Sequence, residues 1–178
     1  MTILICPVSK VRGLIETRGP ERIVSLADPE HGFPDAGADY VGRHLCLSFH
    51  DTVSTDEVPP TAEHVATLVS FLREWTRRAP LLVHCRAGIG RSTATAFIAA
   101  CLHNPSADEH AIACTLRRAS PLARPNPLLV ELADKALGRD GRMIAAIEQT
   151  GRGLSWDEVA RALHANGEGV AFELSSAF

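Results

Sequence analysis

The sequence contains no apolar run long enough to cross a membrane and no regularly spaced cysteine pairs. Its first residues, MTILICPVSK, lack the basic segment and the small-residue cleavage site of a secretory signal. No CxxC and no spacing typical of a tetrahedral metal site occurs among Cys6, Cys46, Cys85, Cys101 and Cys114. An odd, scattered set is typical of reduced thiols, so we expect a cytoplasmic protein without a bound metal or cofactor.

A large excess of charge of either sign is also missing. The 178 residues carry a formal net charge of -3, which gives no support to a nucleic-acid-binding surface. A hydrophobic fraction of 46% and a charged fraction of 22% are typical of a soluble globular domain. We therefore expect neither a nucleic acid nor a membrane as partner. Local groups of arginines, including Arg117 and Arg124, are typical of solvated helix faces but leave an anion site open.

Four short runs rich in Ile, Val and Leu predict β-strands, over residues 3–6, 22–27, 43–49 and 81–85. The first, second and fourth are apolar throughout, which is typical of strands buried on both faces of a parallel or mixed sheet. The glycine, proline and aspartate residues of segment 28–37 predict a loop.

Helical periodicity begins after the prolines at 59–60 and continues through most of the remaining chain. Helices are expected after a Thr61 cap, from about 89 to 103, from a capping box at Ser106 and Glu109 to about 119, from Asn126 to Gly138, over 142–149, and from a second capping box at Ser155 and Glu158 to about 165. The order of elements predicts an α/β fold with a mostly parallel sheet of four to five strands flanked by helices. Residues 1–150 would form the main domain and residues 151–178 a helical appendage packing on it.

The segment VHCRAGIGRS, residues 83–92, places a cysteine, two glycines and an arginine between a buried strand and a helix. Ligands bind at this end of the strands in open α/β sheets. Gly88 and Gly90 allow the turn to curl, so that backbone N–H groups point to one centre at the positive end of the helix dipole. Arg91 adds a planar pair of donors for phosphate oxygens, and the same field favours the thiolate of Cys85. The turn therefore predicts a phosphate-sized anion site with a nucleophilic sulfur at its base.

Two simpler explanations of this turn fit less well. A lone cysteine at a strand end is most often a small buried apolar residue. A glycine turn between a strand and a helix can also bind a nucleotide, but both GxGxxG and the Walker lysine are absent. Neither explanation accounts for His84, Cys85, Arg91 and Ser92 at their fixed intervals.

Residues 84–92, HCRAGIGRS, match HCxxGxxR[ST], the signature of the cysteine-based protein tyrosine phosphatase superfamily. The order of elements over roughly residues 1–140 resembles the compact dual-specificity branch of that superfamily. The resemblance implies a tyrosine or dual-specificity phosphatase acting through a cysteinyl-phosphate, with a phosphorylated protein or other phosphomonoester as partner. Cys85 would attack phosphorus, and Ser92 would help the thiolate to leave or would only cap the helix. Phosphate oxygens would be held by Arg86, Ala87, Gly88, Ile89, Gly90 and Arg91.

The resemblance also implies an aspartic acid, on a loop before the cysteine, that protonates the leaving oxygen. We expect Asp51 in the segment FHDT to be this acid, with Asp56 as the alternative; both could also be solvated loop residues. The Trp-Pro-Asp motif of the larger tyrosine-specific branch is absent, so this expectation rests on the position of Asp51 in the sequence before Cys85. His84 would orient the loop or be a satisfied buried histidine. Asn126 would position the hydrolytic water or cap the helix before Pro127.

Other functions remain as alternatives. Rhodanese-type sulfurtransferases usually have one residue fewer between cysteine and arginine, whereas five residues separate Cys85 from Arg91 here. Low-molecular-weight phosphatases and arsenate reductases carry their cysteine near the N-terminus, which does not agree with a cysteine at position 85. A phosphate-binding module without catalysis and a phosphatase of non-protein esters such as phosphoinositides stay open, although Arg86 and the neutral Ile89 favour a phosphoprotein. A weaker hypothesis pairs oxidised Cys85 with Cys46 or Cys101. The oligomeric state is not predicted.

Overall fold

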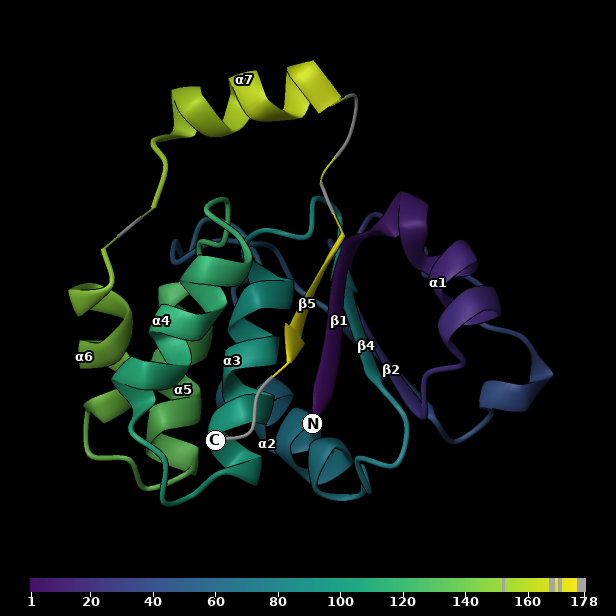
Figure 1. Ribbon diagram of the computed structural model, residues 1–178, viewed down its shortest axis with the longest axis horizontal. Coiled ribbons are helices and arrows are strands. Elements are labelled where there is room, and N and C mark those ends of the chain that lie inside the picture. The colour runs from purple at the N-terminus through teal and green to yellow at the C-terminus, as the bar shows by residue number, and fades with distance from the viewer. Residues whose placement is uncertain (152, 167–168, 170, 176–178) are drawn as a thin grey trace.

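A five-stranded sheet forms the centre of the protein in the computed structural model, and helices lie on both of its faces (Figure 1). The structure describes residues 1–151, 153–166, 169 and 171–175. The strand order is β3-β2-β4-β1-β5, in which β5 alone is antiparallel to its neighbour, β1. The strands are β1 (Thr2–Pro7), β2 (Arg22–Ala27), β3 (His44–Ser48), β4 (Leu81–Cys85) and β5 (Phe172–Ser175). The predicted mostly parallel α/β sheet is therefore confirmed.

The helices divide unequally between the two faces of the sheet. On one face, α1 packs through Val11 against a small apolar cluster that includes Leu4, Ile23 and Leu82. The other face carries the main core, to which α2 to α6 contribute. The helices are α1 (Val11–Arg18), α2 (Ala62–Arg73), α3 (Arg91–His103), α4 (Glu109–Ala119), α5 (Pro127–Ala136), α6 (Arg142–Gln149) and α7 (Trp156–Asn166).

Helix α3 is the central helix of the main core. Every residue from Arg91 to Cys101 is buried, and most of them are small or apolar. Side chains as small as alanine allow the sheet, α4 and α5 to approach α3 closely. Because α3 begins directly after the loop that follows β4, its burial on all sides fixes the position of that loop.

Some elements depart from the sequence-based expectations. Helix α1 was not predicted, because its segment VRGLIETR has few apolar positions and an internal glycine. Strand β5 was not predicted either, and it exists through its pairing with β1. The prediction of a capping box at Ser106 and Glu109 is wrong. Asp108 caps α4 by accepting a hydrogen bond from the His110 N–H. Glu109 forms an ion pair with Arg139 at 2.9 Å.

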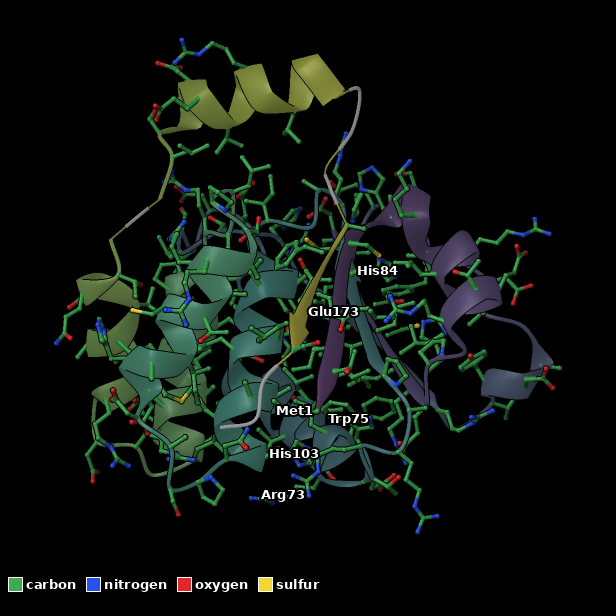
Figure 2. The ribbon with its side chains drawn as sticks, in the orientation of Figure 1. Met1, Arg73, Trp75, His84, His103 and Glu173 are labelled. Carbon is green, nitrogen blue, oxygen red and sulfur yellow. The ribbon has the colours of Figure 1, made fainter. Side chains whose placement is uncertain are left out.

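The remaining boundaries lie close to their predicted positions. Thr61 caps α2, and Trp75 lies just past the end of that helix and is buried in the core. Its indole N–H donates to the Ala79 carbonyl, and its ring meets that of His103 edge to face (Figure 2). In the described part of the chain, no helix is both long and apolar enough to span a membrane.

Candidate active site

The loop of residues 86–90 joins the C-terminal end of β4 to the first turn of α3. Its carbonyl groups are held from outside the loop. The N–H of Val8 donates to the Arg86 carbonyl at 3.3 Å, and the N–H of Arg124 donates to the Ile89 carbonyl at 3.0 Å. The Gly90 carbonyl accepts from the N–H of Ala94 at 3.0 Å. With these carbonyls engaged elsewhere, the N–H groups of the loop are the ones available to an anion beside Cys85.

Both glycines of the loop are required by close contacts. Gly88 has a φ of +75°, and a Cβ there would lie 2.8 Å from the carbonyl carbon of Cys6 on β1. A Cβ at Gly90 would collide with the carboxylate of Asp51. The second contact explains why a glycine precedes Arg91: it leaves space for a side chain that arrives from another loop.

Cys85 and Ser92 face each other across the loop. The distance between Cys85 Sγ and Ser92 Oγ is 3.2 Å, and both side chains are buried. Because Ser92 is in the first turn of α3, its hydroxyl lies at the positive end of the helix dipole. A negative charge on Cys85 would be stabilised by both the hydroxyl and the dipole.

Arg91 is buried and held by two oxygen atoms. Its Nη1 donates to the Phe49 carbonyl at 2.6 Å and forms an ion pair with Asp28 Oδ1 at 2.8 Å. Its Nε, also buried, has no hydrogen-bond partner among the described residues. A buried guanidinium N–H without a partner is costly, which favours an anion as its ligand.

Sequence reasoning missed Asp28. The only available signal was its position, directly after the buried strand β2 and therefore at the same edge of the sheet as Cys85. Its pairing with Arg91 joins two segments far apart in the chain, and no local pattern indicates such a contact.

Asp51 and Asn126 are brought together by their loops. The Asn126 side-chain amide donates to Asp51 Oδ1 at 2.8 Å. The oxygen of the same amide accepts from the N–H of Leu129 at 2.9 Å, so Asn126 also caps α5. Asp56, the alternative acid, is exposed and bonded to the Ser54 hydroxyl. The structure thus places Asp51, and not Asp56, beside the loop of Cys85.

His84 lies within a row of polar side chains that crosses three strands. Its Nε2 shares a hydrogen bond with Ser25 Oγ at 2.5 Å, and the same hydroxyl shares one with His44 Nε2 at 2.6 Å. Burial lowers the pKa of His84 from 6.5 to about 4. The imidazole is therefore neutral at physiological pH, and its contact with Ser25 fixes the end of β4 next to Cys85.

We expect the protein to lose stability as the pH falls from about 6.5 towards 4. Over that range the unfolded chain protonates His84 while the folded protein keeps it neutral, so protons favour the unfolded state. The loss due to this residue should be on the order of 3 kcal/mol at pH 4. Urea unfolding at a series of pH values gives the free energy of unfolding of the wild type and of His84→Gln. The measurement compares how steeply this free energy changes with pH in the two proteins.

The matched control for this measurement is His31→Gln, because His31 is exposed. The free energy of unfolding of His84→Gln should depend less steeply on pH than that of the wild type and of this control, because both of these keep His84. Identical curves for His84→Gln and the wild type would contradict the assignment.

A cavity of about 340 Å³ joins the groups described so far. Cys85, Arg91, Asp28 and Asp51 line it, together with loop residues such as Ile89. Figure 2 shows His84 towards the α7 end of the sheet, and Trp75 and His103 towards the opposite end. A tetrahedral anion in this cavity would meet a thiol, a buried guanidinium and a carboxylate at once.

One group of potential metal ligands lies beside the cavity. Ligand atoms of Asp28, Glu30 and His31 lie within 4.8 Å of one another. Glu30 and His31 are exposed, and Asp28 is engaged by Arg91. A cation at this position would compete with the guanidinium for the Asp28 carboxylate.

The two cysteines suggested as disulfide partners of Cys85 lie away from it. Cys46 pairs with Ser25, which in turn pairs with His84, so about 10 Å of sheet separates Cys46 from the strand of Cys85. Cys101 is in the third turn of α3, about 15 Å along the helix axis from Arg91. A disulfide requires Cα atoms within about 7 Å, so this geometry does not favour either pairing.

Comparisons with known proteins found a family model and solved structures that this chain resembles. Residues 49–125, which contain Asp51, Cys85 and Arg91, match the family model of protein-tyrosine phosphatase. None of the curated protein sequences compared with this chain matches it.

Several solved structures share the fold. One is human tyrosine phosphatase-like serine/threonine/tyrosine-interacting protein, with a TM-score of 0.59, 17% identity and coverage of 76% of this chain and 91% of that one. Human DUSP28 gives a TM-score of 0.53 and 16% identity, with coverage of 75% of this chain and 87% of that one. PTPMT1 in complex with PI(5)P gives a TM-score of 0.54 and 18% identity, with coverage of 76% of this chain and 88% of that one. The predicted resemblance to the protein tyrosine phosphatase superfamily, with a dual-specificity-like fold, is confirmed.

Proposed function

We propose that this protein, which resembles the protein tyrosine phosphatase superfamily, is a cysteine-dependent phosphatase of tyrosine or dual specificity. The observation that carries the proposal is the shared cavity of Cys85, Arg91 and Asp51. It combines a nucleophile, an anion-binding guanidinium and a proton donor around a space that a phosphate group fits.

In the first step, the Cys85 thiolate attacks phosphorus and the bond to the ester oxygen breaks. Arg91 Nε and the N–H groups of residues 86–90 hold the three non-bridging oxygens, where charge is stabilised throughout the transfer. Asp51 gives its proton to the departing oxygen, so the alcohol leaves neutral. The products of this step are the alcohol, a cysteinyl-phosphate and the Asp51 carboxylate.

In the second step, a water molecule attacks the cysteinyl-phosphate. Asp51 now accepts a proton from the water, and the sulfur leaves as a thiolate. The Ser92 hydroxyl, 3.2 Å from the sulfur, donates a hydrogen bond to the thiolate as it forms. Asn126 holds the Asp51 carboxylate through one oxygen, which leaves the other free for the proton in both steps.

The direct test is hydrolysis of p-nitrophenyl phosphate by the wild-type protein in the presence of a chelator. We expect turnover without metal and competitive inhibition by vanadate. A phosphate-binding module without catalysis would bind vanadate and release no p-nitrophenol. Parallel assays with a phosphotyrosine peptide and a phosphoinositide compare the protein and lipid alternatives.

Asp28 should act as a positioning residue for Arg91. Replacing it with alanine removes one of the two anchors of the Nη1 atom and should lower kcat/KM by roughly ten- to a hundredfold, because small displacements of such groups are costly. Asp28→Asn keeps an oxygen acceptor at the same position and should retain most of the activity. Steady-state kinetics with p-nitrophenyl phosphate measures both variants.

Glu30→Gln is the matched control, because Glu30 is in the same loop but is bonded to His50 instead of Arg91. Its kinetics should equal those of the wild type. If Asp28→Asn is as impaired as Asp28→Ala, the charge of Asp28 and not its position as an acceptor is what matters.

A further inference from the structure

Helix α7 forms a wall of the cavity that contains Cys85. Figure 1 shows α7 beyond the end of the molecule at which β1 and its parallel neighbour β4 end, with the C-terminal end of α7 above β1. Val159, Ala160 and Leu163 line the cavity. Their spacing places them on one face of the helix, so this face is directed towards the loop of residues 86–90.

The chain that enters α7 is held by two arginines. Arg117 Nη2 donates to the Gly151 carbonyl at 2.9 Å, and Arg124 Nη1 donates to the Leu154 carbonyl at 2.5 Å. The helix then begins with a complete capping box, in which the Ser155 N–H donates to Glu158 at 2.7 Å and the Glu158 N–H donates to the Ser155 hydroxyl at 3.3 Å. The start of α7 is therefore fixed relative to the main domain.

The chain that leaves α7 is held against the active-site loop itself. Gly169 is buried, and a Cβ at this residue would collide with the carbonyl oxygen of Ala87. Strand β5 then pairs with β1 over four residues. Because the segments before and after α7 are both held against the rest of the protein, α7 is a fixed wall of the cavity.

Among the α7 side chains that the structure describes, those that line the cavity, Val159, Ala160 and Leu163, are all apolar. The cavity lining combines anion-binding groups, around Cys85 and Arg91, with the aliphatic side chains of Ile89 and of the α7 residues Val159 and Leu163. A hydrophilic alcohol packed against these α7 side chains would lose hydrogen bonds to water and gain none from them, which is unfavourable. An aromatic ring loses no such bonds and gains contacts with both aliphatic side chains.

We propose that Val159 and Leu163 are specificity-determining residues that select phosphomonoesters of aryl alcohols over those of hydrophilic alkyl alcohols. This inference rests on the proposed function, since it concerns the part of the substrate that leaves. It assigns a role in substrate choice to residues outside the matched range 49–125.

The test compares Leu163→Asn and Val159→Ser with the wild type on two substrates, p-nitrophenyl phosphate and glycerol 2-phosphate, and on inorganic phosphate as inhibitor. We expect kcat/KM for the aryl ester to fall by about tenfold, the loss typical of a hydrophobic pocket contact. The value for glycerol 2-phosphate should not fall, because a polar side chain in this wall removes no contact that a hydrophilic alcohol makes. The Ki of inorganic phosphate should stay within about twofold, because phosphate has no alcohol group to face the wall. Leu163 is only half-buried, so its replacement should leave the fold intact, as thermal unfolding will verify.

Arg161→Gln is the matched control. Arg161 is an exposed residue of the same helix, its Nε donates to the Asp157 carbonyl, and it is not part of the cavity lining. All of its kinetic constants should equal those of the wild type. Equal losses on both substrates, equal gains on both, or no change in Leu163→Asn and Val159→Ser would each overturn the proposal.

A binding experiment separates this inference from the proposed function. If the wild type hydrolyses neither ester, the proposed function fails, yet calorimetry can still compare phenyl phosphate with inorganic phosphate. The wild type should bind phenyl phosphate more tightly, and Leu163→Asn should lose about tenfold of that preference. Equal preferences in the two proteins would reject the role of α7 whatever the activity.

Discussion

Replacing Cys85 with serine should lower the hydrolysis of p-nitrophenyl phosphate by at least about 10⁴-fold, the scale on which loss of a catalytic nucleophile acts. The hydroxyl of serine is far less ionised than a thiol at neutral pH, so no strong nucleophile would remain at the base of the cavity. Arg91 and residues 86–90 would be unchanged, and inorganic phosphate should still bind. Initial rates and calorimetric titration with phosphate measure the two properties separately.

Cys46→Ser provides the matched control for this variant. Cys46 is an exposed thiol on the edge strand β3, and its replacement should leave the rate unchanged. Both steps of the proposed reaction require the cysteinyl-phosphate. Residual activity of Cys85→Ser above about one per cent of wild type would therefore exclude the covalent mechanism.

Asp51→Asn should lower kcat for phenyl phosphate by about 10² to 10³-fold, within the usual range for a general acid. Asparagine keeps an oxygen that can accept from the Asn126 amide but carries no proton to transfer. The loss should be smaller for p-nitrophenyl phosphate, because its leaving oxygen is less basic and needs less protonation. The measurement is kcat for a series of aryl phosphates whose phenols differ in pKa.

Asp56→Asn is the control, because Asp56 is in the same loop region but is bonded to Ser54 and does not line the cavity. Its kcat values should match the wild type across the series. The opposite pattern, an impaired Asp56→Asn with a normal Asp51→Asn, would transfer the acid role to Asp56. A loss in Asp51→Asn that is independent of the leaving group would point to a role other than proton donation.

Features with a local signal could be predicted from the sequence. The strands at 22–27 and 81–85 coincide with β2 and β4, because a run of apolar residues is enough to identify a buried strand. The turn around Cys85 was recognisable because its cysteine, glycines and arginine occur within ten residues. The proposal of Asp51 as the general acid needed the family resemblance as well, because a single aspartate in a loop carries no pattern of its own.

Features that depend on distant contacts could not be predicted. The pairing of Asp28 with Arg91 joins loops at the ends of two different strands. Asn126 was expected to position the hydrolytic water or to cap the helix before Pro127. Its oxygen caps α5, and its nitrogen donates to Asp51, a contact that no local pattern indicated. The capping box of α7 was visible in the sequence, but its location over the cavity depends on Arg117, Arg124 and the pairing of β5.

Strand β5 also has a consequence for how one molecule meets another. Without it, β1 would present a row of unpaired backbone donors and acceptors, on which a strand of a second molecule could assemble. With it, the outermost strand is short and carries Glu173, whose carboxylate pairs with Arg18 at 2.7 Å (Figure 2). A brief strand bearing a charged pair is a poor template for further strand addition, so the same segment that completes the sheet also protects the protein from edge-to-edge aggregation.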